Sequence, residues 1–175
     1  PIIPEELEVR VKNLVQMRNL MDRLEAQHQM MRDMAMHDRL TGLYNRHYLE
    51  EIVPRLIREA RDGQQPLSLV VIDIDHFKAI NDEHGHQMGD RVLAAIAETL
   101  QAFCWRNGFV ASFGGEEFIM LQPNVNLLQT VMVADRIRGR LEKLMPQGIA
   151  VSASFGVATL HPAENFDQLF KRADD

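Results

Sequence analysis

The sequence is poor in the features that mark secreted, membrane-spanning or nucleic-acid-binding proteins. Its one cysteine, Cys104, rules out an internal disulfide bond and is typical of a reducing compartment. It has no apolar run of membrane-spanning length and no signal-peptide pattern. We therefore expect a cytoplasmic protein, or the cytoplasmic part of a larger, membrane-anchored one, without direct membrane contact in this segment.

Positive charge is also in short supply. The chain has 19 Lys and Arg against 25 Asp and Glu, a net charge of −6, and a surface of this kind disfavours nonspecific binding to nucleic acid. A small anionic ligand is still compatible with this balance, because a metal ion can neutralise its phosphates locally. Nucleic acid is therefore not an expected partner, whereas a phosphorylated small molecule is.

Glycine and proline are missing from residues 5–36. Apolar residues recur there at alternating spacings of three and four, with Arg10 and His28 at the two remaining positions of the stripe, and this pattern predicts one long helix with a heptad seam. The apolar members are Ile3, Leu7, Leu14, Met17, Met21, Leu24, Met31 and Ala35. We expect residues 1–37 to form a parallel coiled coil that makes a homodimer; packing of the stripe on the chain's own domain is the alternative.

Residues 38–175 have the length and apolar content of one compact domain. Periodicity and turn residues predict helices at 46–61, 90–105, 127–144 and 165–174, strands at 67–74 and 150–159, and a hairpin of 109–113 with 117–121. Pro54 should kink the first of these helices. This order predicts an α+β, ferredoxin-like antiparallel sheet with helices on one face.

Two acidic pairs flank the predicted sheet. Asp73 and Asp75 end the apolar strand 67–74, and Glu116 and Glu117 follow the glycine pair 114–115 at the hairpin tip. Such acids can cap a helix, pair with Lys78 or solubilise a hairpin, but they can also hold magnesium, which prefers oxygen ligands. Because neighbouring strand residues point to opposite faces, only one of the two glutamates is expected to share a site with Asp73.

The segment after the strand carries two residues suited to a purine. The amide of Asn81 both donates and accepts hydrogen bonds, and the carboxylate of Asp90 can accept two, as the N1–H and amino group of guanine require. Asp90 can instead cap a helix that begins nearby, and spacing alone favours that interpretation. The pair His84 and His86 is a poor transition-metal site, because no third histidine or cysteine joins it.

These segments together resemble the GGDEF family. The resemblance runs from Asp38 to the end of the chain, with the motifs in the family's order and spacing. It rests on residues 38–46 (DRLTGLYNR), 73–82 (DIDHFKAIND) with 85–86 and 89–90, 114–118 (GGEEF) and 151–158 (VSASFGVA). It implies a nucleotidyl-cyclase-like fold after a coiled-coil signalling helix, which is a common arrangement in the family.

The resemblance also implies roles for individual residues. The metal would be bound by Asp73, Glu116 and the carbonyl of Ile74, with Glu117 adding to the site, and the family implies Mg²⁺, two ions per site, with Mn²⁺ as a substitute. The residues implied in catalysis are Asp73, Lys78, Glu116 and Glu117. Those implied in substrate binding are Asn81 and Asp90 for guanine, the backbone at His76 and Phe77 for the phosphates, and Gly114 and Gly115.

The implied activity is that of a diguanylate cyclase, which condenses two GTP molecules into cyclic di-GMP and two pyrophosphates. Each subunit would hold one GTP, and the active site would form between two subunits, so tethering by a coiled coil raises the effective concentration of the half-sites. An upstream sensor or regulatory domain is the expected further partner. The alternative is a degenerate GGDEF domain that binds GTP or dimerises and regulates a partner without turnover.

The sequence departs from the family pattern at three places. Ser112 stands where the family usually has arginine before the aromatic residue of its signature. The Arg-x-x-Asp product-inhibition motif would fall at 105–108, where the chain has Trp-Arg-Asn-Gly. The family's late lysine and arginine, which anchor the triphosphate, would follow Asp174, so we expect the chain to be a piece of a longer protein.

Overall fold

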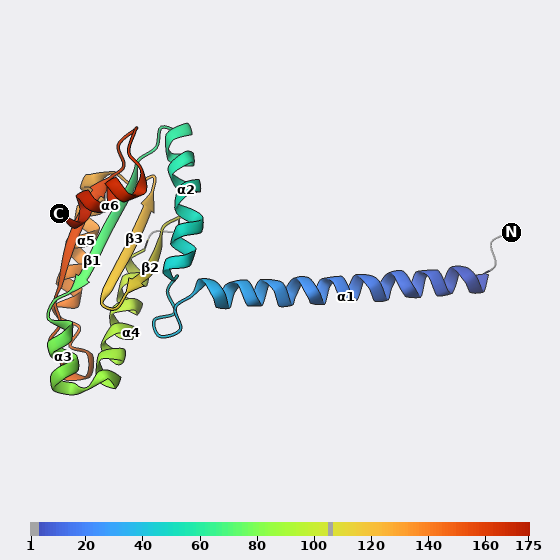
Figure 1. Ribbon diagram of the computed structural model, residues 1–175, viewed down its shortest axis with the longest axis horizontal. Coiled ribbons are helices and arrows are strands. Elements are labelled where there is room, and N and C mark those ends of the chain that lie inside the picture. Colours follow the sequence, from blue (N-terminus) through green and yellow to red (C-terminus); the bar gives the residue numbers. More distant parts are fainter. Residues whose placement is uncertain (1–3, 105–106) are drawn as a thin grey trace. The chain divides into compact units, whose positions relative to one another are not determined.

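We describe the chain from a computed structural model, which places residues 4–104 and 107–175 (Figure 1). It divides into two units, one ending at Met36 and one running from His37 to Asp175. No helix among the placed residues is both long enough and apolar enough to cross a membrane.

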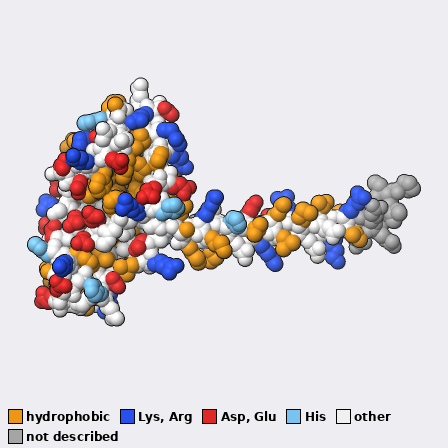
Figure 2. All heavy atoms as spheres, viewed as in Figure 1, with side chains coloured by type: hydrophobic (Ala, Val, Ile, Leu, Met, Phe, Trp, Pro, Cys, Tyr) orange, Lys and Arg blue, Asp and Glu red, His pale blue; other side chains and the backbone are white. Residues whose placement is uncertain are grey.

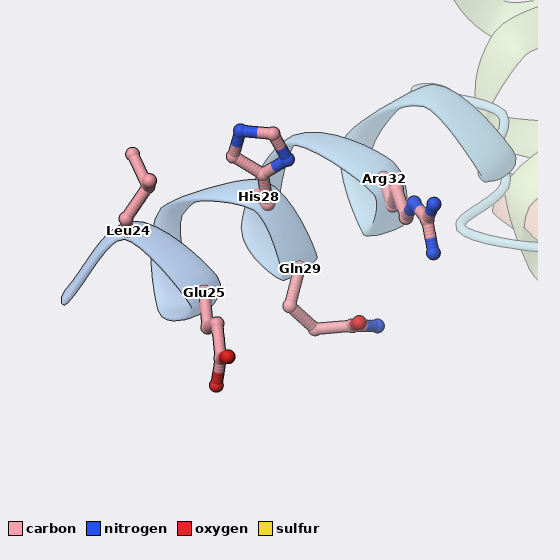
Figure 3. Close-up of a pocket in the computed structure, with 5 residues that line it drawn as sticks. All are labelled: Leu24, Glu25, His28, Gln29 and Arg32. Carbon is pink, nitrogen blue, oxygen red and sulfur yellow. The ribbon is translucent and has the colours of Figure 1, made fainter. Parts of the chain in front are cut away.

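The first unit is the single helix α1, Pro4–Met36, as the absence of glycine and proline predicts. Its large apolar side chains are exposed between Val9 and Met34 (Figure 2), with Leu14 64% and Met31 69% exposed. Figure 3 shows Leu24 and His28 pointing to one side of α1, as the heptad register requires, and Glu25 and Gln29 pointing elsewhere. The hollow that these residues line with Arg32 is open on the surface of one helix.

The second unit is built on a four-stranded antiparallel sheet in the order β2-β3-β1-β4. The strands are β1 Leu67–Ile74, β2 Phe109–Gly114, β3 Glu117–Pro123 and β4 Ala153–Thr159. At one end of the sheet Asp73 of β1 lies opposite Glu117 of β3 and Ser154 of β4; at the other end Ser68 lies opposite Thr159. This register decides which side chains meet at each end.

Helices cover both faces of this sheet (Figure 1). On one face α2, Arg46–Asp62, and α6, Phe166–Asp174, bury Leu69, Val71 and Ile119. On the other face α4, His86–Phe103, and α5, Leu127–Leu141, bury Val70, Ile72 and Phe118. The α+β antiparallel fold is confirmed, but the expectation of helices on one face is wrong. The continuous apolar run of β1 is the sequence signal for burial on both faces.

Several elements differ from their expected extents. The sequence pattern did not predict α3, Phe77–His84, whose C-cap residue is Gly85 with φ 83°. A 3₁₀ turn, η1 at Pro146–Gly148, follows α5, and β4 starts at Ala153 rather than 150. Helix α2 runs through Pro54 as one element. Short helices and turns of this kind carry too few apolar repeats to be recognised by periodicity.

Candidate active site at the acidic end of the sheet

Three carboxylates gather where β1 ends and the β2-β3 hairpin turns. Asp73 and Glu117 are directly opposite each other in neighbouring strands, so their side chains leave the sheet on the same face. Glu116 lies in the turn, and its carbonyl oxygen accepts a hydrogen bond of 3.3 Å from the backbone N–H of Ile74. A turn residue does not follow the strict alternation of strand side chains, and this explains why both glutamates are coupled to Asp73, where the sequence pattern allowed one: the charge of Glu116 acts on Asp73, and the charge of Asp73 acts on Glu117.

Two of these acids, Asp73 and Glu117, have a raised pKa. Burial is the largest cause of the raised pKa of Asp73, and the neighbouring charges of Glu116, Asp75 and Asp174 raise this pKa further. The pKa of Glu117 is raised by burial and then by Asp73, Asp174 and Glu116, while Arg46 lowers it. Like charges held together disfavour ionisation. The group therefore carries more negative charge than its surroundings compensate, and Asp174 of α6 is a member that sequence reasoning did not place there.

Asp75 is set apart from this group by its own partners. Its two carboxylate oxygens accept hydrogen bonds from the hydroxyls of Ser152, at 2.6 Å, and Ser154, at 2.7 Å. The Ser152 bond is the main cause of a pKa below the usual aspartate value. These bonds join the end of β1 to the start of β4, and they give Asp75 a structural role next to the acids of the hairpin.

The hairpin tip depends on the conformational freedom of its glycines. Gly114 has φ 154° and Gly115 has φ 56°, which side-chain-bearing residues rarely adopt. A Cβ atom on either residue would meet nothing within 4 Å. The backbone conformation therefore requires these glycines, and the space beside them is open to a ligand.

The donor set at this end fits a hard divalent cation. Among the placed residues no group of three or more Asp, Glu, His or Cys side chains closes around a metal position. Magnesium does not need such a cage, because it is usually held by one or two carboxylates together with substrate phosphates. Asp73, Glu116 and Glu117 offer such carboxylates. The side chain of Ile74 is a hydrocarbon, so this residue has only its backbone carbonyl oxygen to contribute.

Helix α3 begins directly after the acids and brings the expected phosphate-binding segment to the same end of the sheet. His76 precedes the helix with φ 56°, and its carbonyl accepts the N–H groups of Ala79 and Ile80. Phe77 is buried in the core, so it can offer a ligand its backbone and not its ring. Lys78 is exposed on the first turn of the helix.

Asn81 and its surroundings form an incomplete polar site between α3 and α4. Its side-chain oxygen is buried without a hydrogen-bond partner in the structure. The amide packs against Gly89, where a Cβ atom would collide with it, so this glycine makes room for the asparagine. A buried polar atom without a partner is costly, and a ligand that donates a hydrogen bond would satisfy it.

Asp90 follows Gly89 and does not cap the helix. Helix α4 begins at His86 and its N-cap is Gly85, so Asp90 lies in the second turn, where no backbone N–H remains to be capped. The helix-cap interpretation, which spacing favoured, is therefore wrong. Asp90 is exposed, and it lies one residue after the glycine that packs on Asn81.

Arg46, like Asp174, lies near the acids and was not recognised as a site residue from the sequence. It opens α2, and its guanidinium lies 4.8 Å from the ring centroid of Phe113, the residue before the hairpin glycines. Its charge acts on Glu117. The DRLTGLYNR motif had marked the segment without indicating this role. Ser112 lies on β2, and Trp105 and Arg106, where the product-inhibition motif would fall, lie outside the described residues.

Proteins of known sequence or structure resemble this chain over most of its length. It is 36% identical to the response regulator PleD of Caulobacter vibrioides over 183 aligned residues, which cover 100% of this chain and 40% of PleD. The crystal structure of the coiled coil and GGDEF domain of DgcB from Caulobacter crescentus, in complex with c-di-GMP, superposes with a TM-score of 0.85 and 30% identity, covering 96% of this chain and 90% of that one.

A third relative shares the hairpin sequence. The structure of the active GGEEF domain of a diguanylate cyclase from Vibrio cholerae has a TM-score of 0.71 and 33% identity, covering 75% of this chain and 86% of that one. Residues 35–175 match the model of the family described as "Diguanylate cyclase, GGDEF domain". This match covers the whole compact unit and confirms the resemblance drawn from the motifs: the chain belongs to the GGDEF family.

Proposed function

We propose that this chain is the catalytic part of a diguanylate cyclase, which joins two GTP molecules into cyclic di-GMP and releases two pyrophosphates. The chain spans about 40% of the length of PleD, so the proposal concerns the GGDEF unit and the helix before it. The Vibrio cholerae relative with the same five-residue hairpin is an active domain by its description, and this supports turnover here.

The observation that carries the proposal is the uncompensated group of acids at the hairpin. Asp73 and Glu117 face each other across the β1-β3 pair, and Glu116 lies in the turn directly before Glu117. The raised pKa values of Asp73 and Glu117 mark a place that a cation would stabilise. An acidic group intended only for solubility would be spread over the surface, where such repulsion is screened.

Magnesium is the metal we propose, with two ions per site and Mn²⁺ as a substitute. Asp73, Glu116, Glu117 and the carbonyl of Ile74 are the proposed ligands. When bound, the metal supplies Lewis-acid stabilisation of the phosphoryl oxygens and lowers the pKa of the attacking 3′-hydroxyl. The chain's own residues bind and orient the nucleotide: the α3 backbone at His76 and Phe77, with Lys78, positions the phosphates beside the hairpin glycines.

Guanine is the base we propose for the polar site that Asn81 and Asp90 offer on α3 and α4. The orphaned side-chain oxygen of Asn81 would accept a hydrogen bond from the base, and Asp90 would accept from N1–H and the amino group. Adenine has no N1–H and carries its amino group elsewhere, so it would leave Asp90 without donors. The same two residues therefore bind the substrate and select it.

Product analysis tests this function directly. The chain, within its longer protein, is incubated with GTP and Mg²⁺, and the product is identified by mass spectrometry and by its retention against cyclic di-GMP. We expect cyclic di-GMP and pyrophosphate, no product from ATP, and none after chelation of the metal. GTP binding without any product would instead support a degenerate domain that regulates a partner.

The proposed assembly is a homodimer through α1. The apolar seam of α1 is exposed in the single chain, at Leu14, Met17, Met21 and Leu24. The DgcB structure contains a coiled coil together with its GGDEF domain, and it matches 96% of this chain. Each of these side chains contributes roughly 1.5–3 kcal/mol when fully buried, before ordering costs. The two half-sites would thus be tethered in a cytoplasmic dimer under an upstream sensor.

A charge in the seam tests the assembly. Met21→Glu places two like charges face to face in the apolar interface, so we expect monomers in light scattering while the GGDEF unit remains folded. Activity should fall at low protein concentration and partly recover at high concentration, because the half-sites must meet by diffusion. Asn19→Glu, on the outer face of the same helix, is the matched control. A Met21→Glu protein that stays dimeric would refute dimerisation through the apolar seam of α1.

A further inference from the structure

The position of Arg46 is not explained by the stability of its own helix. It is the first residue of α2, where the positive end of the helix dipole repels a cation. Its pairing with Glu50, 3.3 Å at i,i+4, has the arginine before the glutamate, which is the less favourable order. Both side chains are more than 60% exposed, and exposed pairs contribute little.

The contacts of Arg46 direct it to the hairpin instead. The guanidinium lies over Phe113, and Phe113 packs against Phe170 of α6 with ring centroids 5.2 Å apart. Tyr44 fixes the start of α2 to the hairpin strand β2, because its backbone bonds both Val110, at 3.2 Å, and Ser112, at 2.8 Å. The guanidinium is thus held beside the turn that carries the glycines and glutamates.

The donor groups of Arg46 are only partly used. In the part of the chain that the structure describes, Nε donates to Glu50 and the two terminal nitrogens donate to no protein acceptor. A guanidinium presents its terminal N–H groups as a fork that matches phosphate oxygens. Its charge also lowers the pKa of Glu117 against three acids that raise it. Arg46 is therefore a cation at the edge of an acidic site, and its terminal N–H groups are available to a ligand.

We propose that Arg46 is a phosphate-binding residue of this site. Its terminal N–H groups donate hydrogen bonds to the polyphosphate of the nucleotide beside the hairpin. The proposal rests on the proposed function, because it takes GTP as the ligand. An anion with several charges is repelled by Asp73, Glu116 and Glu117. A fixed cation beside them offsets this repulsion where the phosphates must approach, and the ring of Phe113 holds it there without neutralising it.

This role has a signature that a structural role lacks. Removing a cation from an acidic site weakens the binding of an anion, but it leaves the binding of a metal cation unchanged or makes it tighter, because one repulsive charge is gone. A merely structural Arg46 would hold the hairpin in place, and its loss would weaken both ligands together. Comparing the binding of an anion with the binding of a metal cation therefore distinguishes a phosphate-binding Arg46 from a merely structural one.

The experiment uses calorimetry on the dimeric protein with three probes: α,β-methylene GTP with Mg²⁺, guanosine with Mg²⁺, and Mn²⁺ alone. We expect Arg46→Ala to bind the triphosphate about 5–20-fold more weakly and to bind guanosine and Mn²⁺ at least as well as the wild type. Arg46→Lys, which keeps the charge and loses the fork, should lie between. Arg55→Ala is the matched control, because Arg55 pairs with Glu59 in the same helix at 3.4 Å with similar exposure.

The outcomes separate this inference from the proposed function. Unchanged triphosphate affinity in Arg46→Ala, an equal loss in Arg55→Ala, or a parallel loss for all three probes would overturn the role of Arg46. A wild-type protein that binds the triphosphate but makes no cyclic dinucleotide would refute the cyclase activity and leave the Arg46 test valid. A wild-type protein that binds no triphosphate would overturn both.

Discussion

The two ends of the sheet shift the pKa values of their carboxylates in opposite directions. At the end where Ser68 lies opposite Thr159, buried Glu164 receives two bonds from Arg172, of 2.6 and 2.7 Å, and one from the backbone N–H of His161. These bonds, led by that of Arg172, lower its pKa to about 2. At the end where Asp73 lies opposite Glu117, burial and neighbouring acids raise both pKa values.

Helix α6 contributes to both ends. Arg172 donates to Glu164 and to the carbonyl oxygen of Thr159, and Arg61 of α2 donates to the carbonyl oxygen of Glu164. Two residues after Arg172, Asp174 adds its charge to the acids of the other end. The comparison teaches that one end is completed by the protein itself, whereas the other is left for ligands to complete. Substitutions at the two ends should therefore have different consequences.

Removing a carboxylate from the incomplete end should abolish activity without unfolding the protein. We expect Asp73→Ala or Glu116→Ala to lower the rate of cyclic di-GMP formation by more than about 1000-fold, because each change removes a ligand of the metal that stabilises the developing charge. Circular dichroism and thermal unfolding should stay close to wild type. Product formation at the wild-type rate in either variant would refute the metal assignment.

Removing the carboxylate from the complete end should do the reverse. Glu164→Ala removes the carboxylate partner of Arg172 and leaves it only the carbonyl oxygen of Thr159, and we expect a loss of about 1.5–3 kcal/mol of unfolding free energy at pH 7. The folded-state pKa of Glu164 is below its unfolded value, so this stabilisation is present above about pH 4.5 and lost as the pH falls toward 2. Denaturant titrations at pH 7 and pH 3 should therefore show a large difference between variant and wild type at pH 7 and a smaller one at pH 3.

The purine site should respond in binding rather than in stability. Asp90→Ala is expected to weaken GTP binding by about 1–3 kcal/mol, because two donors of the base lose their acceptor, and to reduce the preference for GTP over ATP. Helix content should not change, since Asp90 is not a cap. Glu98→Ala, an exposed acid on the same helix, is the control. Equal GTP affinity in the two variants would show that Asp90 does not read the base.

The smallest effect concerns the repulsion itself. Asp73→Asn removes one charge from the acidic end, and we expect the metal-free variant to be more stable than wild type by a few tenths of a kcal/mol at pH 7, since the group is partly exposed. The raised pKa of Asp73 means that its ionised form is disfavoured in the folded state, so the gain should vanish at pH 3, where the wild-type acid is protonated. A variant less stable than wild type at pH 7 would contradict the repulsion.

The local motifs made much of the site predictable. The glycine pair at 114–115 indicated a tight turn, and the turn does require two positive φ angles. The order of apolar segments indicated an antiparallel α+β fold, because strand and helix periods differ. Asp90 shows the limit of this reasoning. Its spacing is compatible with a helix cap, and only the start of α4 at His86 excludes that interpretation.

Other members of the site come from distant parts of the chain. Arg46 opens a helix and Asp174 ends another, and in sequence both look like ordinary surface charges. They reach the acids because α2 and α6 pack on the same sheet face as Asp73 and Glu117. No spacing rule links residues 46, 73, 117 and 174, since their proximity depends on how helices cover the sheet.

The chemical groups available to this protein can be recognised without a structure: acids after an apolar strand, a glycine turn, an asparagine and an aspartate suited to guanine, and a helix with an apolar seam. Residue types and short-range spacing carry that information, because turns and periodicities are local properties of the chain. Which acids repel one another, which one is paired with Arg172, and where Arg46 lies depend on the folded structure. Electrostatic coupling acts through space, and distance in space is set by the packing of the whole sheet and its helices.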